Sequence, residues 1–156
     1  MDAWAKGWVA VELIDGRFAS GYAVKRLAEL GARGDFDAVA VDIPMGLLNS
    51  GFRAAEPAAR QVLGKRSSSV FTTPPLPVLR EESHAAANAL CKRLTGMGLS
   101  AQSYALRERV LEADELYGSQ RLNLIEVHPE VSFAMMGEGP LAASKKTWRG
   151  LHERMA

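Results

Sequence analysis

The sequence has little cysteine, almost no net charge and no long hydrophobic run. Its single cysteine, Cys91, excludes an internal disulfide bond and any zinc site built from several cysteines. A formal net charge of +1 gives the whole molecule no attraction to nucleic acid, so a site for a polyanion has to be a local patch. No apolar run approaches the length of a membrane span, and the first residues do not resemble a signal peptide. We therefore expect a cytoplasmic protein without a membrane partner.

The chain also lacks repeats, low-complexity tracts and linkers. Its 156 residues suffice for one domain with a buried core, and a hydrophobic fraction of 47% is ordinary for a globular protein. We expect a single domain over residues 1–156. Both ends are abrupt, because Met1 leads straight into a strand-like pattern and the last residues stop inside a helix-like one. We therefore expect a fragment truncated at both ends and incomplete at the C-terminus.

Hydrophobic periodicity predicts an α/β fold with a mixed β-sheet covered by α-helices. The expected strands are 8–13, 18–22, 38–41 and 123–127, with Asp15-Gly16 as the turn of a hairpin. The expected helices are 24–30, 57–63, 81–94, 101–117 and 130–136, and Ser144 opens a last helical stretch. Ser100 is expected to cap the helix that follows it. The charged residues of helix 101–117 are expected to form a solvated face whose members pair with one another.

The segment around Asp42 is the first candidate for a functional site. A short run of small and β-branched residues, 38–41, leads into Asp42, and Pro44 and Gly46 then turn the chain. A carboxylate at the end of a buried strand costs desolvation unless it is paired, hydrogen-bonded or bound to a metal. Ligands of open α/β sheets gather beyond the carboxyl ends of the strands. Asp42 is therefore either a working residue or a carboxylate that caps a turn.

A second acidic group follows the strand at 123–127. Glu126, His128 and Glu130 surround Pro129, which ends this strand. If this strand end lies near Asp42, the carboxylates and an imidazole share one crevice, and oxygen-rich clusters suit Mg²⁺ or Mn²⁺. The His-x-Glu spacing also occurs in zinc deaminases, but the Pro-Cys-x-x-Cys motif that they require is absent.

The polar segment 64–71 is a candidate anion site. It contains two cationic residues, Lys65 and Arg66, followed by the hydroxyl-bearing Ser67 and Ser68. Such groups form short, strong hydrogen bonds to phosphate oxygens. The segment is not a Walker A loop, because Ala59 stands where that motif needs glycine. The alternative is a solvated loop between a helix and a strand.

Several motifs occur in one order along the chain. They are Val41-Asp42-Ile43-Pro44-Met45-Gly46-Leu47, Ala59-Arg60, Leu63-Gly64, Arg66-Ser67-Ser68-Ser69-Val70-Phe71, Gly98-Leu99-Ser100-x-Gln102, Glu126-Val127-His128-Pro129-Glu130-Val131-Ser132-Phe133 and Ser144-Lys145-Lys146. As a set, over nearly the whole chain, they resemble domain-of-unknown-function family 429. Members of that family are described as predicted nucleases with a ribonuclease-H-like fold.

The resemblance implies a ribonuclease-H-like mixed β-sheet flanked by α-helices, whose first strand carries Asp2 beside the strand that ends at Asp42. In such nucleases these acids bind a divalent metal that activates water. The resemblance thus implies Mg²⁺ or Mn²⁺ on Asp2, Asp42 and Glu126. Glu130 is expected close by, and His128 is expected to orient a group or move a proton. The residues expected to hold phosphate are Arg60, Lys65, Arg66, Ser67, Ser68 and Lys145.

The leading functional hypothesis is a metal-dependent nuclease that hydrolyses phosphodiester bonds, with nucleic acid or a nucleotide as substrate. One alternative is a phosphoryl-transfer enzyme, since actin-like kinases share this sheet topology, although no nucleotide-binding glycine motif supports it. Another alternative is a non-catalytic module that binds nucleic acid or small anions. Metal-dependent cleavage separates the first hypothesis from the others, and binding or hydrolysis of ATP separates the second.

Overall fold

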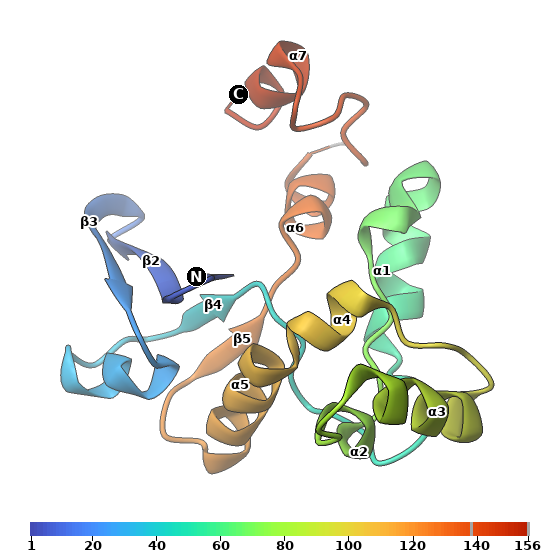
Figure 1. The fold of residues 1–156 in the computed structure, drawn as a ribbon. Helices are drawn as coiled ribbons and strands as arrows, with labels where there is room; N and C mark the ends of the chain where they lie inside the picture. The colour runs from blue at the N-terminus through green and yellow to red at the C-terminus, as the bar shows by residue number, and fades with distance from the viewer. Residues whose placement is uncertain (138, 156) are drawn as a thin grey trace. The chain divides into compact units, whose positions relative to one another are not determined.

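The structure, a computed structural model, describes residues 1–137 and 139–155. The chain forms two compact units: unit 1 comprises Met1–Phe52 and Thr73–Val127, and unit 2 comprises Arg53–Thr72 and His128–Ala156. Strands flanked by helices confirm the α/β class, as Figure 1 shows. The single domain stays a prediction, because two compact units can belong to one domain.

Unit 1 begins with an antiparallel sheet of β1 (Asp2–Trp4), β2 (Gly7–Ile14) and β3 (Arg17–Val24). The predicted hairpin is confirmed, with Ile14 opposite Arg17 across the turn. Asp15 and Gly16 have φ angles of 52° and 73°, and these left-handed values suit the twist of a tight hairpin. Buried and exposed residues alternate along the first half of β2, so the sheet has one core face and one outer face.

A second strand pair consists of β4 (Val39–Val41) and β5 (Leu124–Glu126), which run parallel. The 3-10 helix η1 (Leu27–Ala32) precedes β4. The helix expected at 24–30 was therefore placed too early, because Val24 still pairs with Trp8 as the last residue of β3.

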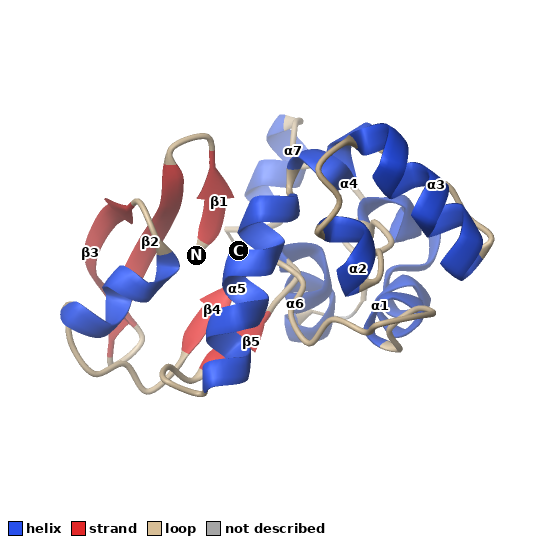
Figure 2. Cartoon of the chain, turned by 60° about the horizontal axis from the view of Figure 1, so that its bottom comes forward, coloured by secondary structure: helices blue, strands red, loops and turns tan. Residues whose placement is uncertain are grey.

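The core of unit 1 lies between the strands and the helix α5 (Arg107–Ser119). Figure 2 shows α5 running across β4 and β5. The buried residues that the strands, η1 and the helices contribute to this core include Trp8, Leu27, Leu30, Val39, Val41, Leu79, Val110, Ala113 and Leu124. Helices α2 (Leu76–Leu79), α3 (His84–Thr95) and α4 (Ala101–Ala105) complete the unit, with Cys91 buried in a smaller cluster on α3.

Two helix predictions need correction. The helix expected at 81–94 begins only at His84, because Ser83 caps it by accepting a hydrogen bond from the Ala86 N–H at 3.2 Å. The helix expected at 101–117 is interrupted at Leu106, which ends α4 and precedes α5. The predicted cap at Ser100 is confirmed by its hydrogen bond from the Ser103 N–H at 3.0 Å.

Unit 2 contains α1 (Ala55–Leu63), the 3-10 helix η2 (Gly64–Ser69), α6 (Pro129–Met136) and α7 (Trp148–His152). Buried residues Leu63, Val70 and Ala134 join these elements into a small core. The segment expected as a loop at 64–71 is thus largely helical, because its backbone continues from α1 through a 3-10 turn. Ala156, at the end of the last expected helical stretch, lies outside the described residues.

Among the described residues, no helix combines the length and the hydropathy needed to cross a membrane.

Candidate functional site

Two backbone hydrogen bonds join β1 to β4 in unit 1. The Met1 nitrogen donates to the Ala40 carbonyl at 2.6 Å, and the Asp42 N–H donates to the Met1 carbonyl at 2.9 Å. This is the bonding pattern of parallel neighbours, with Met1 opposite Val41. The strand that carries Asp2 therefore lies beside the strand that ends at Asp42, and the bonds of Met1 connect the three-stranded sheet β1-β2-β3 to the strand pair β4-β5 at this position.

The alternation of side chains along the strands assigns Asp2 and Asp42 to the same face. Each follows one residue after the opposed pair of Met1 and Val41, and side chains alternate between the two faces of a sheet. Val41 is buried in the core, so the alternation assigns both carboxylates to the outer face. Asp2 is exposed and Asp42 is half-buried.

The charges of Asp2 and Asp42 both act on the α-amino group of Met1. Burial lowers the pKa of this ammonium below its ordinary value, and the negative charges of Asp2 and Asp42 act in the opposite direction. Both acids thus lie within electrostatic range of one cation. Their oxygens are the hard ligands that Mg²⁺ and Mn²⁺ prefer.

Glu126 lies at the same end of the neighbouring strand. It is opposite Val41 in the parallel pair of β4 and β5, so the same alternation assigns it to the core side of the strands, whereas Asp2 and Asp42 are assigned to the outer face. Its Oε2 accepts a hydrogen bond from the Met45 N–H at 2.9 Å, and Asp114 on α5 accepts one from the Leu47 N–H at 2.9 Å. These two carboxylates hold the chain turn that follows Asp42.

Sequence reasoning assigned Glu112 to a solvated face of its helix and did not single out Asp114. Glu112 instead accepts hydrogen bonds from Trp8 Nε1 at 3.1 Å and from the Leu27 N–H at 2.6 Å. The expected pairing on this face is present, since Arg109 also contacts Glu112 at 3.1 Å. A signal was available: a carboxylate next to the buried positions of a helix can reach the backbone that the helix covers.

The described residues contain no group of three or more histidine, cysteine, aspartate or glutamate side chains arranged to hold a metal ion. Two carboxylates satisfy the chemistry of magnesium, however, because this ion keeps several waters and is usually bound through one or two carboxylates. Asp2 and Asp42 therefore fit a divalent ion by donor type and by their place on adjacent strands.

The other predicted residues lie in unit 2, where Glu130 is the centre of a buried ion-pair cluster. Arg154 binds it through two contacts of 2.7 Å, and Arg66 approaches it at 3.6 Å. Arg66 also donates to the carbonyls of Leu141 and Ala143, at 3.0 and 2.6 Å. Glu130 and Arg66 thus attach the C-terminal segment to α6 and η2.

Arg60 and His128 also make contacts inside unit 2. Arg60 donates to the Val70 carbonyl at 3.0 Å and to the Thr72 hydroxyl at 2.7 Å. His128 Nε2 lies 3.3 Å from the Ser69 carbonyl, which can only accept, so Nε2 carries the proton of this contact. His128 Nδ1 is buried and has no hydrogen-bond partner among the described residues.

The remaining predicted phosphate ligands are accessible on unit 2. Lys65, Ser68 and Lys145 are exposed, and Ser67 is half-buried. Lys65, Ser67 and Ser68 share η2, whereas Lys145 lies in the segment before α7.

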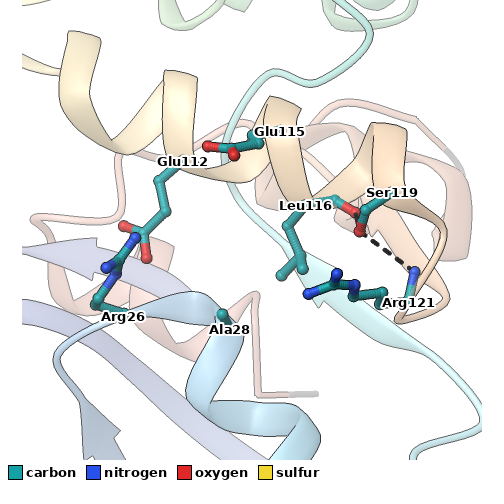
Figure 3. Close-up of a pocket in the computed structure, with 7 residues that line it drawn as sticks. All are labelled: Arg26, Ala28, Glu112, Glu115, Leu116, Ser119 and Arg121. Atoms are coloured by element: carbon teal, nitrogen blue, oxygen red, sulfur yellow. Dashed lines mark hydrogen bonds between the residues drawn. The ribbon is translucent and has the colours of Figure 1, made fainter.

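A separate pocket of about 260 Å³ lies in unit 1 between η1 and α5. Figure 3 shows its side chains, among which Arg26 and Glu112 point toward one another. Its lining residues are Arg26, Ala28, Glu112, Glu115, Leu116, Ser119 and Arg121. None of them is a residue that the sequence predicted for the site.

The chain matches a family model described as "Protein of unknown function (DUF429)" over residues 1–156. The chain therefore belongs to the DUF429 family, as the motifs indicated. No curated protein and no solved structure matches the chain.

Proposed function

We propose that the protein is a divalent-metal-dependent nuclease of ribonuclease-H-like fold. The observation that carries the proposal is the parallel placement of the Asp2 strand beside the strand that ends at Asp42. Two further features support it: β2 and β3 pair antiparallel on one side of β1, and β5 pairs parallel with β4. The family relationship is consistent with this proposal.

In this proposal Asp2 and Asp42 hold Mg²⁺ or Mn²⁺ through carboxylate oxygens. A bound divalent ion supplies an activated water and stabilises charge on the leaving oxygen of a phosphodiester. Glu126 positions the turn after Asp42 through its bond from Met45, and as a proposed further ligand it would have to turn from the core side of β5 toward Asp42. Two carboxylates at neighbouring positions of adjacent strands favour this role, because a metal site needs ligands that converge on one place.

Anion binding on unit 2 is a separate part of the proposal. Lys65, Ser67, Ser68 and Lys145 offer cations and hydroxyls that can bind phosphate oxygens. Arg60 and Arg66 would have to exchange carbonyl partners for phosphate oxygens. Glu130 and His128 remain proposed catalytic residues, although Glu130 would first have to leave its two arginines.

Cleavage of labelled single-stranded and duplex DNA and RNA tests the proposal. We expect cleavage in Mg²⁺ and none in a chelator, and we expect Asp42→Asn to abolish it because the variant lacks the anionic ligand. Glu82→Gln is the matched control, since Glu82 is an exposed acid of unit 1. Binding without cleavage by the wild-type protein would overturn the nuclease assignment, and ATP hydrolysis without cleavage would favour phosphoryl transfer.

A further inference from the structure

Two arginines line the pocket of about 260 Å³ between η1 and α5. Arg26 directly precedes η1, and Arg121 follows the end of α5. Figure 3 shows their side chains at opposite ends of the pocket, with Ala28 between them. Among the described residues, neither guanidinium forms a hydrogen bond or an ion pair. The pocket therefore contains two cations whose hydrogen-bond donors are available to a ligand.

Hydrogen bonds hold the backbone at both arginines. The Arg26 N–H donates to the Glu29 carboxylate at 3.1 Å, and the Arg121 N–H donates to the Ser119 hydroxyl at 3.4 Å. Both positions are thus attached to η1 and α5, which share the core of unit 1. A ligand has to order only the two arginine side chains, so binding costs little conformational entropy.

Two acids, Glu112 and Glu115, add negative charge to the same pocket. The Glu112 carboxylate is already occupied, because it accepts a hydrogen bond from Trp8 Nε1 and pairs with Arg109, both at 3.1 Å. Glu115 is exposed, and among the described residues it has no hydrogen-bond or ion-pair partner. Glu115 therefore repels a bare anion, but it can accept a hydrogen bond from a hydroxyl group of a ligand.

We propose that this pocket binds a small phosphate monoester that carries a hydroxyl group. Such a monoester has a charge of about −1.5 to −2 near neutral pH, and two guanidiniums can balance this charge through charge-assisted hydrogen bonds. A lone carboxylate has one negative charge and needs only one arginine. The volume lies just below the roughly 300 Å³ at which pockets for drug-sized ligands begin, so the ligand is small.

This pocket is separate from the proposed metal site. The elements that form it contribute Leu27 and Ala113 to the core, together with Val41 from the strands. The alternation along the strands assigns Asp2 and Asp42 to the opposite, outer face. Phosphate binding in the pocket therefore does not depend on a divalent ion, and its test is done without one.

Amide NMR with glycerol 3-phosphate, in a chelator that removes divalent ions, tests the proposal. We expect the amide resonances of Ala28 and Arg121 to shift saturably, and glycerol alone to leave them unchanged. Arg26→Gln and Arg121→Gln should each weaken binding at least about tenfold, because each removes charge-assisted hydrogen bonds to the phosphate. Arg93→Gln is the matched control and should bind like the wild type, since Arg93 is an exposed arginine of unit 1 outside the pocket.

Glu115→Ala tests the hydroxyl group of the ligand. We expect this variant to bind inorganic phosphate more tightly, because a negative charge is removed from the pocket. The affinity for glycerol 3-phosphate relative to inorganic phosphate should fall, because the hydroxyl loses its acceptor. An unchanged ratio of the two affinities would overturn the assignment of the hydroxyl.

Resonances outside the pocket that match those of the wild type show that each variant is folded. With that established, the lack of saturable shifts at Ala28 and Arg121 in the wild type would overturn the proposal, as would equal shifts with glycerol. Undiminished affinity for glycerol 3-phosphate in both arginine variants, or an equal loss in Arg93→Gln, would overturn it as well.

Discussion

The Glu112 carboxylate forms hydrogen bonds with three neighbouring residues of unit 1. Its carboxylate accepts hydrogen bonds from the indole of Trp8, the backbone N–H of Leu27 and the guanidinium of Arg109. These contacts join β2, the start of η1 and α5. Hydrogen bonds to a charged acceptor are stronger than neutral ones, so this residue contributes more than an ordinary surface acid.

We expect Glu112→Gln to lower the free energy of unfolding by about 2 kcal/mol, since the charged acceptor is lost while two donors stay partly buried. Urea unfolding measures the change. Glu115→Gln is the control: Glu115 is exposed on the same helix, and its effect should stay within about 0.5 kcal/mol. Equal losses in the two variants would contradict the role assigned to Glu112.

At the scale of elements, the turn between β1 and β2 depends on Gly7. Its φ is 151°, and a Cβ there would overlap the carbonyl oxygen of Val24. Gly16 has a φ of 73°, but open space surrounds its Cα. Both positions favour glycine, and only Gly7 also lacks room for a side chain.

Gly7→Ala should therefore cost more than about 2 kcal/mol, combining backbone strain with a collision. Gly16→Ala should cost about 1 kcal/mol, because only the left-handed backbone is strained. Thermal and urea unfolding compare the two variants. If Gly16→Ala were the more damaging, the close packing of the start of β2 against the end of β3 would be wrongly described.

The ion pair of Glu130 with Arg154 stabilises the attachment of the C-terminal segment in unit 2. Both side chains are 9% exposed. We expect Glu130→Gln to cost about 3 kcal/mol, because Arg154 would keep a buried charge without its partner. Glu108→Gln removes the exposed pair with Arg107 and should cost less than about 1 kcal/mol. Urea unfolding of both variants gives the comparison, and similar costs would contradict the burial argument.

Glu153 makes this attachment sensitive to acid. A hydrogen bond from the Ala143 N–H lowers the pKa of its carboxyl, and Arg149 adds to the effect. The unfolded chain binds the proton more readily, so the stabilisation is present above about pH 4.5 and is lost as the pH falls through the lowered value. Glu153→Gln should therefore flatten the dependence of stability on pH below about 4.5. An unchanged slope in unfolding experiments between pH 3 and pH 5, about the range of carboxyl titration, would contradict this account.

The elements themselves were predictable where a local signal was strong. The Asp15-Gly16 turn defined the hairpin, and Ser100 defined the start of a helix. The start of α3 required recognising Ser83 as a cap, and the break at Leu106 carries no proline or glycine that would announce it. Boundaries depend on such single hydrogen bonds, which periodicity does not contain.

At the scale of the whole molecule, the motifs predicted the family, and the bonds of Met1 agree with the expected neighbourhood of Asp2 and Asp42. The ion pair of Glu130 with Arg154 could not be predicted, because 24 residues separate the partners and no spacing rule relates them. The same holds for Arg66 and the carbonyls of Leu141 and Ala143, which only tertiary packing brings together.

The central claim is that Asp2 and Asp42 hold one divalent ion, and Mn²⁺ titration followed by electron paramagnetic resonance tests it directly. We expect the wild-type protein to bind Mn²⁺, and Asp2→Asn and Asp42→Asn each to weaken binding by at least about tenfold, because each removes an anionic ligand. Glu82→Gln should bind like the wild type. Undiminished Mn²⁺ affinity in Asp42→Asn would contradict the account.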